Sequence, residues 1–189
     1  MERGEVMKKI GFYSILLIIS LLFNWDIYAE NIVKQELMQK PGIYVYQVQE
    51  EPTTYMDPMV WIPVPLQSEI TMKEQVYNTI ESLFQWSNTE DLYSCIPQGT
   101  SVLSVAIEKD QCILNISQEL IQYGGGTYIE KMIVEQLCAT VFSFPQIQKV
   151  TILIEGMFQI LPEGTEIQEI ERKQWEENQK EVTQNGAVI

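Results

Sequence analysis

The stretch that decides the fold lies within residues 95–155, and its first half reads SVLSVAIEKDQCILNI from residue 101 to residue 116. Apolar and polar residues alternate on both sides of a short charged turn, which is the pattern of strands with one buried face. This pattern predicts a hairpin with strands over 101–108 and 112–116. The side chains expected on its buried face are Leu103, Val105, Ile107, Cys112, Leu114 and Ile116.

The second half of the stretch predicts a helix. Residues 117–122 favour a short helical turn, which the three glycines at 124–126 interrupt. Thr127 is the expected N-cap of the following helix, because Glu130 three residues later gives the spacing of a capping box. The residue before Pro145 avoids helical geometry, so the helix should end there.

This helix should be amphipathic, followed by a last strand. Its apolar residues recur every four positions, as on one face of a helix; they are Ile129, Ile133, Leu137 and Val141. The polar residues expected on the solvent side are Glu130, Lys131, Glu135 and Gln136. Residues 150–155, VTILIE, are rich in β-branched side chains and too short for another helix, so they predict a strand.

Two strands and a helix are expected upstream of this stretch, and a polar tail downstream. The strands are predicted over 43–48 and 59–64, the second at a sheet edge because Pro63 lacks a backbone donor. A capping-box spacing and an apolar face predict a helix over 72–86; the residues concerned are Thr71, Glu74, Val76, Ile80, Leu83 and Phe84. Residues 169–189 should form a frayed helix or be disordered.

The order of these motifs resembles the GerMN family of sporulation and germination proteins. The shared features are LYSCIPQGT at 92–100, the hairpin, the glycine loop with its helix, FPQIQKV at 144–150 and IEG at 154–156. The resemblance spans residues 41–168, although Asn115 stands where an acidic residue is common and Cys95 where a smaller one is. It implies an α/β domain without catalytic residues, built from a mixed sheet of four to five strands with two main helices on one face, similar to ring-building modules.

The segment before the domain predicts export from the cytoplasm. An uncharged apolar run at 10–23 follows Lys8 and Lys9, as in a secretory signal. The run is shorter than the roughly 17–25 residues of a membrane-spanning helix. Residues 1–29 are therefore either a signal peptide cleaved after Ala29 or an uncleaved signal anchor, and 30–40 form a tether. In both cases the domain lies outside the cytoplasm.

The composition excludes several kinds of chemistry. The sequence has no histidine, so it cannot form Ser-His-Asp or Cys-His nucleophilic sites or histidine-ligated metal sites. Its net charge of −14 argues against electrostatic binding to nucleic acid. Packing explains the positions of Cys95, Cys112 and Cys138, and no two of them form a Cys-x-x-Cys pair. We therefore expect three free thiols and neither a bound metal nor a cofactor.

Two further patterns could indicate a site but have simpler explanations. The glycines at 124–126 lack the Lys-Ser/Thr of a phosphate loop, and Ile129 stands where a dinucleotide fingerprint needs glycine, so a flexible turn is favoured. Paired carboxylates could serve hydrolysis across a cleft, but 26 acidic residues make such pairs common by chance. The pairs are Glu90 with Asp91 and Glu50 with Glu51.

The resemblance implies a non-enzymatic assembly or scaffolding factor of sporulation or germination, outside the cytoplasm. Its partners would be envelope proteins, including sporulation channel components or further copies of the chain. The alternative is a weakly hydrolytic module that binds a ligand or the cell wall. It would use carboxylates and the aromatic residues Trp61, Trp86 and Tyr123. A deep pocket with convergent carboxylates would favour this alternative. The candidate partner surface comprises Trp61, Tyr123, Gly124, Gly125 and Gly126, although the simpler interpretation of Trp61 is a buried side chain that packs on the helices.

Overall fold

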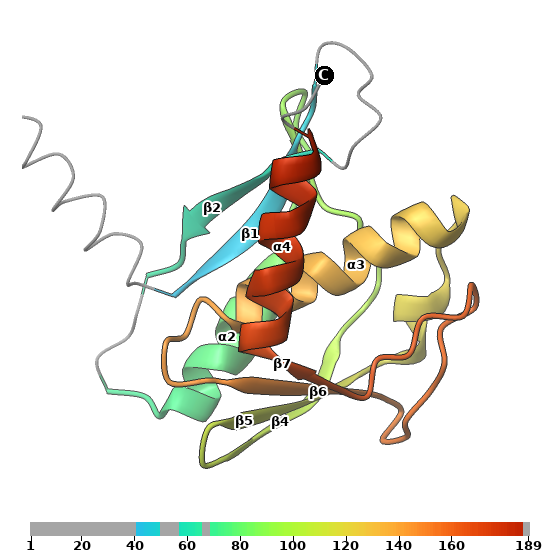
Figure 1. Cartoon of the computed structure of the whole chain (residues 1–189). Coiled ribbons are helices and arrows are strands. Elements are labelled where there is room, and N and C mark those ends of the chain that lie inside the picture. The colour runs from blue at the N-terminus through green and yellow to red at the C-terminus, as the bar shows by residue number, and fades with distance from the viewer. Residues whose placement is uncertain (1–40, 50–56, 66–68, 187–189) are drawn as a thin grey trace, which may run out of the picture. The chain divides into compact units, whose positions relative to one another are not determined.

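The strands form two sheets, as the computed structural model shows for residues 41–49, 57–65 and 69–186 (Figure 1). One sheet has three antiparallel strands in the order β2–β1–β3, and the other has four in the order β4–β5–β6–β7. The expected mixed α/β class is confirmed, with the strands divided between two sheets. The strands are β1 Gly42–Gln47, β2 Met59–Pro63, β3 Leu92–Tyr93, β4 Val102–Glu108, β5 Gln111–Ile116, β6 Lys149–Ile154 and β7 Glu169–Glu171.

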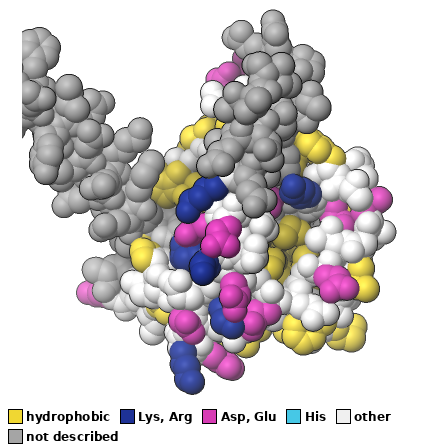
Figure 2. Space-filling model, in the orientation of Figure 1, with side chains coloured by type: hydrophobic (Ala, Val, Ile, Leu, Met, Phe, Trp, Pro, Cys, Tyr) yellow, Lys and Arg dark blue, Asp and Glu magenta, His cyan; other side chains and the backbone are white. Residues whose placement is uncertain are grey.

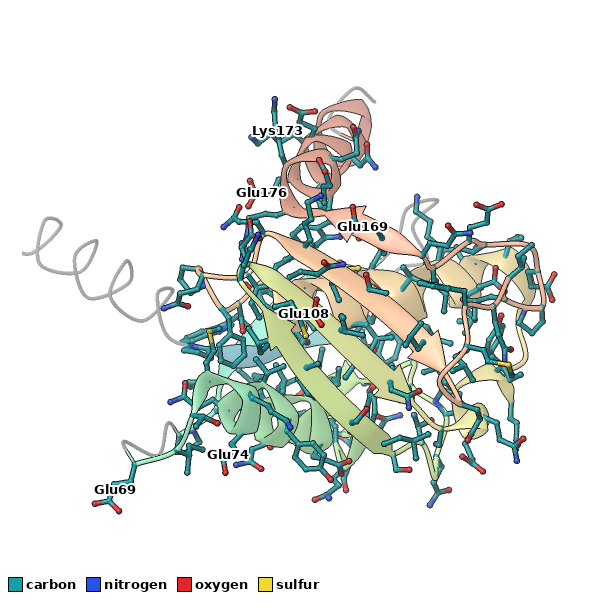
Figure 3. All side chains as sticks on the ribbon, turned by 90° about the horizontal axis from the view of Figure 1, so that it is seen from below. Glu69, Glu74, Glu108, Glu169, Lys173 and Glu176 are labelled. Carbon is teal, nitrogen blue, oxygen red and sulfur yellow. The ribbon has the colours of Figure 1, made fainter. Side chains whose placement is uncertain are left out.

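Two helices, α2 and α3, cover one face of the four-stranded sheet. Figure 3 shows the opposite face turned toward the viewer, with Glu108 on β4 and Glu169 on β7. The helices in the described part of the chain are α2 Met72–Phe84, the short 3-10 helix η1 Gln118–Ile121, α3 Gly126–Val141 and α4 Arg172–Gly186. None of these is long and apolar enough to cross a membrane; the expected signal segment lies outside the described residues.

The capping box of α2 is confirmed. The backbone N–H of Glu74 donates to Oγ1 of Thr71 at 3.3 Å, and the Glu74 carboxylate accepts the Thr71 N–H at 2.8 Å. This reciprocal pair satisfies two of the N–H groups that a helix start leaves without partners. The helix therefore begins where the sequence predicts.

The core lies between the helices and the inner face of the four-stranded sheet. Because β5 and β6 run parallel in register, their inward side chains form matched rows. These rows pair Cys112 with Val150, Leu114 with Ile152 and Ile116 with Ile154, all fully buried. The helices complete this core with the buried residues Val76, Ile80, Leu83, Ile133, Leu137 and Val141.

Leu103 does not lie on the buried face of the hairpin, contrary to its alternation pattern. The register of β4 against β5 shifts between Val102 and Ser104, so one extra residue interrupts the alternation. Val102 is consequently buried, while 46% of Leu103 is exposed. The backbone N–H of Val102 donates to the Glu81 carboxylate of α2 at 2.8 Å, which satisfies it at the irregularity.

The edge position of β2 agrees with the prediction from Pro63, whereas β7 was not expected. Residues 169–171 pair with β6, and α4 follows directly. Arg172 fixes this junction, because its guanidinium donates to the carbonyls of Phe144 at 2.7 Å and Ile147 at 2.8 Å. The polar tail thus includes a strand and a docked helix.

Candidate functional site

The start of α3 is defined by glycine geometry. Gly125 is the N-cap, with a φ of 103°, and the helix begins at Gly126. The prediction that Thr127 caps the helix is therefore wrong. A Cβ on Gly125 would lie 2.5 Å from the side chain of Ile129, so both the backbone conformation and the close contact require glycine here.

Glu130 does not face solvent, although its helical spacing placed it there. Its side chain is fully buried and accepts the backbone N–H groups of Glu163 at 2.7 Å and Thr165 at 2.8 Å, together with the hydroxyl of Tyr123. Burial alone would raise the pKa of Glu130, but these hydrogen bonds outweigh it and lower the pKa. The carboxylate therefore stays ionised and joins α3 to two loops.

Gln136 is also buried rather than on the solvent side of α3. Its amide oxygen accepts the N–H of Cys95 at 3.0 Å and the hydroxyl of Ser94 at 3.2 Å. Its amide nitrogen donates to the carbonyl of Tyr44 at 2.8 Å. The side chain thereby connects β1 to the loop after β3, which fixes one wall of the pocket described next.

An open pocket of about 490 Å³ lies between β3 and the start of α3. One wall comes from Tyr93 and the loop that follows it as far as Gln98, and the other from Gln122, Tyr123 and Gly124. Ile129 of α3 also contributes. Every lining side chain is uncharged at neutral pH, so the pocket is a neutral hollow in a strongly acidic protein.

Carboxylates behind the pocket hold its two tyrosine hydroxyls. Tyr93 donates to Asp57 at 2.7 Å, and Tyr123 donates to Glu130. Burial and these hydrogen bonds raise the pKa of both phenols, so both stay protonated. Each hydroxyl therefore donates its only proton to a carboxylate.

The pocket cysteine is not activated. Burial, with a smaller contribution from the Asp57 carboxylate, raises the pKa of Cys95 to about 12. A thiol in this range is scarcely ionised at neutral pH and is a poor nucleophile. Cys112 and Cys138 are buried in the core, as their sequence positions predict. Among the described residues, no three acidic or cysteine side chains converge as metal ligands.

The residues of the predicted partner surface occupy two separate places. Tyr123 and Gly124 line the pocket, and Gly125 and Gly126 shape the helix start. Trp61 lies on β2, on the opposite edge of the three-stranded sheet from β3. Figure 1 shows β2 and the start of α3 on opposite sides of the described fold.

Trp61 is half-buried against the neighbouring strand. Its indole lies so close to Gly42 of β1 that a Cβ on this glycine would overlap it and would also stand 2.5 Å from the carbonyl oxygen of Ile62. Glycine at this position leaves room for the ring. The indole therefore packs on the sheet and still presents part of its surface to solvent.

The predicted acidic pairs do not converge on the pocket. Glu90 and Asp91 are exposed in the segment before β3 and are not among the lining residues. Glu50 and Glu51 lie outside the described residues. Trp86 is half-buried against the core, and its indole nitrogen lacks a hydrogen-bond partner among the described residues.

An exposed apolar loop follows β6, and the sequence reasoning missed it. Its exposed side chains are Met157 at 59%, Phe158 at 64% and Ile160 at 64%. Figure 2 shows hydrophobic side chains gathered at the lower right, where Figure 1 draws the segment between β6 and β7. The signal available in the sequence was the cluster MFQI immediately after Gly156, outside any predicted strand or helix.

Together, the two sheets, the glycine-capped helix and the neutral pocket define a small mixed α/β domain. A family model described as Germane, sporulation and spore germination, matches residues 43–160. This match covers more than half of the chain, so the chain belongs to the Germane family of GerMN-domain proteins. No curated protein gives a significant match.

Solved structures share this fold. The first GerMN domain of the sporulation protein GerM from Bacillus subtilis superposes with a TM-score of 0.55 at 22% identity, over 70% of this chain and 97% of that domain. The tandem GerMN domains of the same protein give a TM-score of 0.55 at 22% identity, over 71% of this chain and 46% of theirs. A Clostridium perfringens protein described as a lipoprotein gives a TM-score of 0.50 at 20% identity, over 70% of this chain and 86% of that protein's chain.

Proposed function

We propose that this chain is a non-enzymatic scaffolding protein of sporulation or spore germination, acting outside the cytoplasm. Its family is linked to both processes. The apolar run after Lys8 and Lys9 supports export, and so does the description of the Clostridium perfringens structure as a lipoprotein. The partners would be envelope proteins, including components of the channel between the mother cell and the forespore, or further copies of the chain.

The observation that carries this proposal is the exposed apolar loop after β6. Met157, Phe158 and Ile160 each expose more than half of their surface. Clustered exposed apolar side chains are typical of protein interaction sites, because water exclusion there gives binding free energy. A scaffold would use such a surface to bind its partner.

The apolar loop is also fixed in position. Leu161 and Ile167 are buried at its C-terminal end, and Glu130 holds the backbone of Glu163 and Thr165. Backbone hydrogen bonds between Ile154 and Met157 close the turn at its other end. A surface that is already ordered loses little conformational entropy on binding, which favours association.

The experiment replaces the loop side chains in the native host. A Phe158→Ser and Ile160→Ser double variant should lower the yield of heat-resistant spores and the recovery of cross-linked partner proteins. The matched control is Leu103→Ser, which makes the same kind of change at an exposed apolar residue on β4. Circular dichroism and the melting temperature of each variant show whether its fold is retained.

Two further variants test the predicted partner surface and the hydrolytic alternative. Trp61→Ala tests whether the β2 edge takes part in partner binding. The double variant Glu90→Gln and Asp91→Asn tests the carboxylate alternative. If the loop variant folds, sporulates normally and recovers the same partners, while the carboxylate variant loses activity, the scaffolding function is wrong.

A further inference from the structure

The pocket between β3 and the start of α3 combines aromatic rings with hydrogen-bonding groups that the fold leaves available. Tyr93 and Tyr123 supply the rings, and their hydroxyls donate to Asp57 and Glu130, which do not line the pocket. Gln98 and Gln122 are exposed, and within the described part of the chain their side-chain amides make no hydrogen bond. An amide group both donates and accepts.

The lining restricts the chemistry of a ligand. No carboxylate or basic side chain lines the pocket, so it offers an ion pair neither to a cation nor to an anion. The net charge of −14 also repels anions. A purely apolar ligand would take the two amides out of water without giving them partners, which is unfavourable. These conditions favour a neutral ligand with both an apolar face and many hydrogen-bonding groups.

A sugar residue has these properties. One face of a pyranose ring presents C–H groups that can stack on an aromatic ring, and the hydroxyls around its rim both donate and accept. The pocket volume of about 490 Å³ falls within the usual range of small-molecule sites. We propose that the pocket between β3 and the start of α3 binds a neutral sugar residue of an oligosaccharide. This inference does not rest on the scaffolding function, because it is tested with the purified chain alone.

The direct test measures binding of two neutral tetrasaccharides to the full chain. The probes are tetra-N-acetylchitotetraose and cellotetraose, which together show whether acetamido groups contribute. The chain is kept in an oxyethylene detergent, since a sugar-based detergent would compete for the pocket. Saturation-transfer difference NMR detects contact with the sugar, and calorimetry gives the Kd. The proposal requires saturable binding of at least one probe, and no binding of either probe would overturn it.

Two variants locate the binding within the pocket. Gln98→Ala with Gln122→Ala removes two exposed amides and should raise Kd about tenfold. Gly124→Leu should abolish binding, because it adds a large side chain to a lining residue; a Cβ at this position has no atom within 4 Å and its φ is not positive, so the backbone is not strained. An unchanged melting temperature confirms that each variant folds.

The matched control is Gln148→Ala, an exposed glutamine beyond the other end of α3. It should leave Kd unchanged within twofold. If all variants bind the sugar like the unmodified chain, binding lies elsewhere and the proposal is wrong. If neither sugar binds but Gly124→Leu loses a cross-linked protein partner, the pocket is a protein contact, and the sugar proposal is also overturned.

Discussion

At the scale of single residues, Glu130 shows how a buried charge can organise a surface. Its carboxylate accepts two backbone N–H groups and the Tyr123 hydroxyl, so one side chain supports both the pocket wall and the apolar loop. Removing one member of a buried hydrogen-bonded group leaves its partners without bonds, which costs more than the bond itself contributes. The two proposed surfaces therefore share one structural support.

Glu130→Gln should destabilise the fold at neutral pH. The glutamine amide keeps one acceptor oxygen, but an NH₂ group replaces the second carboxylate oxygen. This NH₂ group then faces groups that are themselves hydrogen-bond donors. We expect the free energy of unfolding to fall by about 1–3 kcal/mol, as for hydrogen bonds to charged groups. Urea denaturation measures the change. Glu108→Gln, at an exposed glutamate on β4, is the control and should have no measurable effect; equal stability of the two variants would contradict the structural role of Glu130.

The same residue predicts how stability depends on pH. Because folding lowers the pKa of Glu130, its ionised form stabilises the fold at pH values above the ordinary glutamate pKa of about 4.3. This contribution is lost as the pH falls through the lower pKa of the folded state. The urea midpoint of the unmodified chain should therefore drop more steeply between pH 5 and pH 3 than that of Glu130→Gln. Parallel curves would show that Glu130 does not contribute.

The cysteines should be reduced and slow to react. Burial raises the pKa of Cys112 to about 12, and burial with the Asp57 carboxylate does the same for Cys95, so little thiolate exists at pH 8. Ellman's reagent should titrate three thiols in unreduced, denatured protein and react slowly with the native chain. A count of one thiol after denaturation would reveal a disulfide.

At the scale of elements, α3 belongs to both the core and the site. Its buried face includes Leu137, which packs in the core shared with the four-stranded sheet. Its N-terminal part carries Ile129 and Glu130, one lining the pocket and the other supporting it. The position of this helix therefore sets the geometry of the pocket.

Leu137→Ala should weaken the whole fold. The side chain is 1% exposed, and removing its methyl groups leaves a cavity as well as losing burial. We expect a loss of roughly 2–5 kcal/mol in the free energy of unfolding. Lys131→Ala, on the exposed side of the same helix, is the control and should change little. A melting temperature that does not move would show that Leu137 is outside the core.

The C-terminal helix α4 shows how a polar segment can become part of the fold. Trp175 packs against Phe142 with ring centroids 5.5 Å apart, and its indole donates to Glu135 at 2.6 Å. Arg172 lies over the same phenylalanine ring, 4.9 Å from its centroid. A few contacts of this kind order a segment whose composition is mostly polar.

At the scale of the whole molecule, the topology prediction concerns where the domain lies. Lys8 and Lys9 precede the apolar run at 10–23, and positive residues on this side remain in the cytoplasm. Protease added to intact protoplasts should digest the domain, or the domain should be found in the medium if the signal is cleaved. A cytoplasmic protein serves as the protected control. Complete protection of the domain would contradict export.

The sequence alone determined most of the elements, because their signals are local. Alternation identified β5, the helix periodicity identified the buried face of α3, and Thr71 with Glu74 marked the start of α2. Each depends on residues close together in the chain, where side-chain spacing and backbone geometry are directly linked. The family followed from the order of these elements.

The tertiary structure alone decided which polar groups are buried and which apolar groups are exposed. Glu130 and Gln136 occupy polar positions of a helix, yet partners far away in the sequence bury them. Leu103 has the spacing of a core residue, yet a register shift turns it outward. The pocket likewise joins residues near 93–98 with those near 122–129. Local periodicity contains no information about such distant partners, and hydrogen bonding to them decides the burial of a polar side chain.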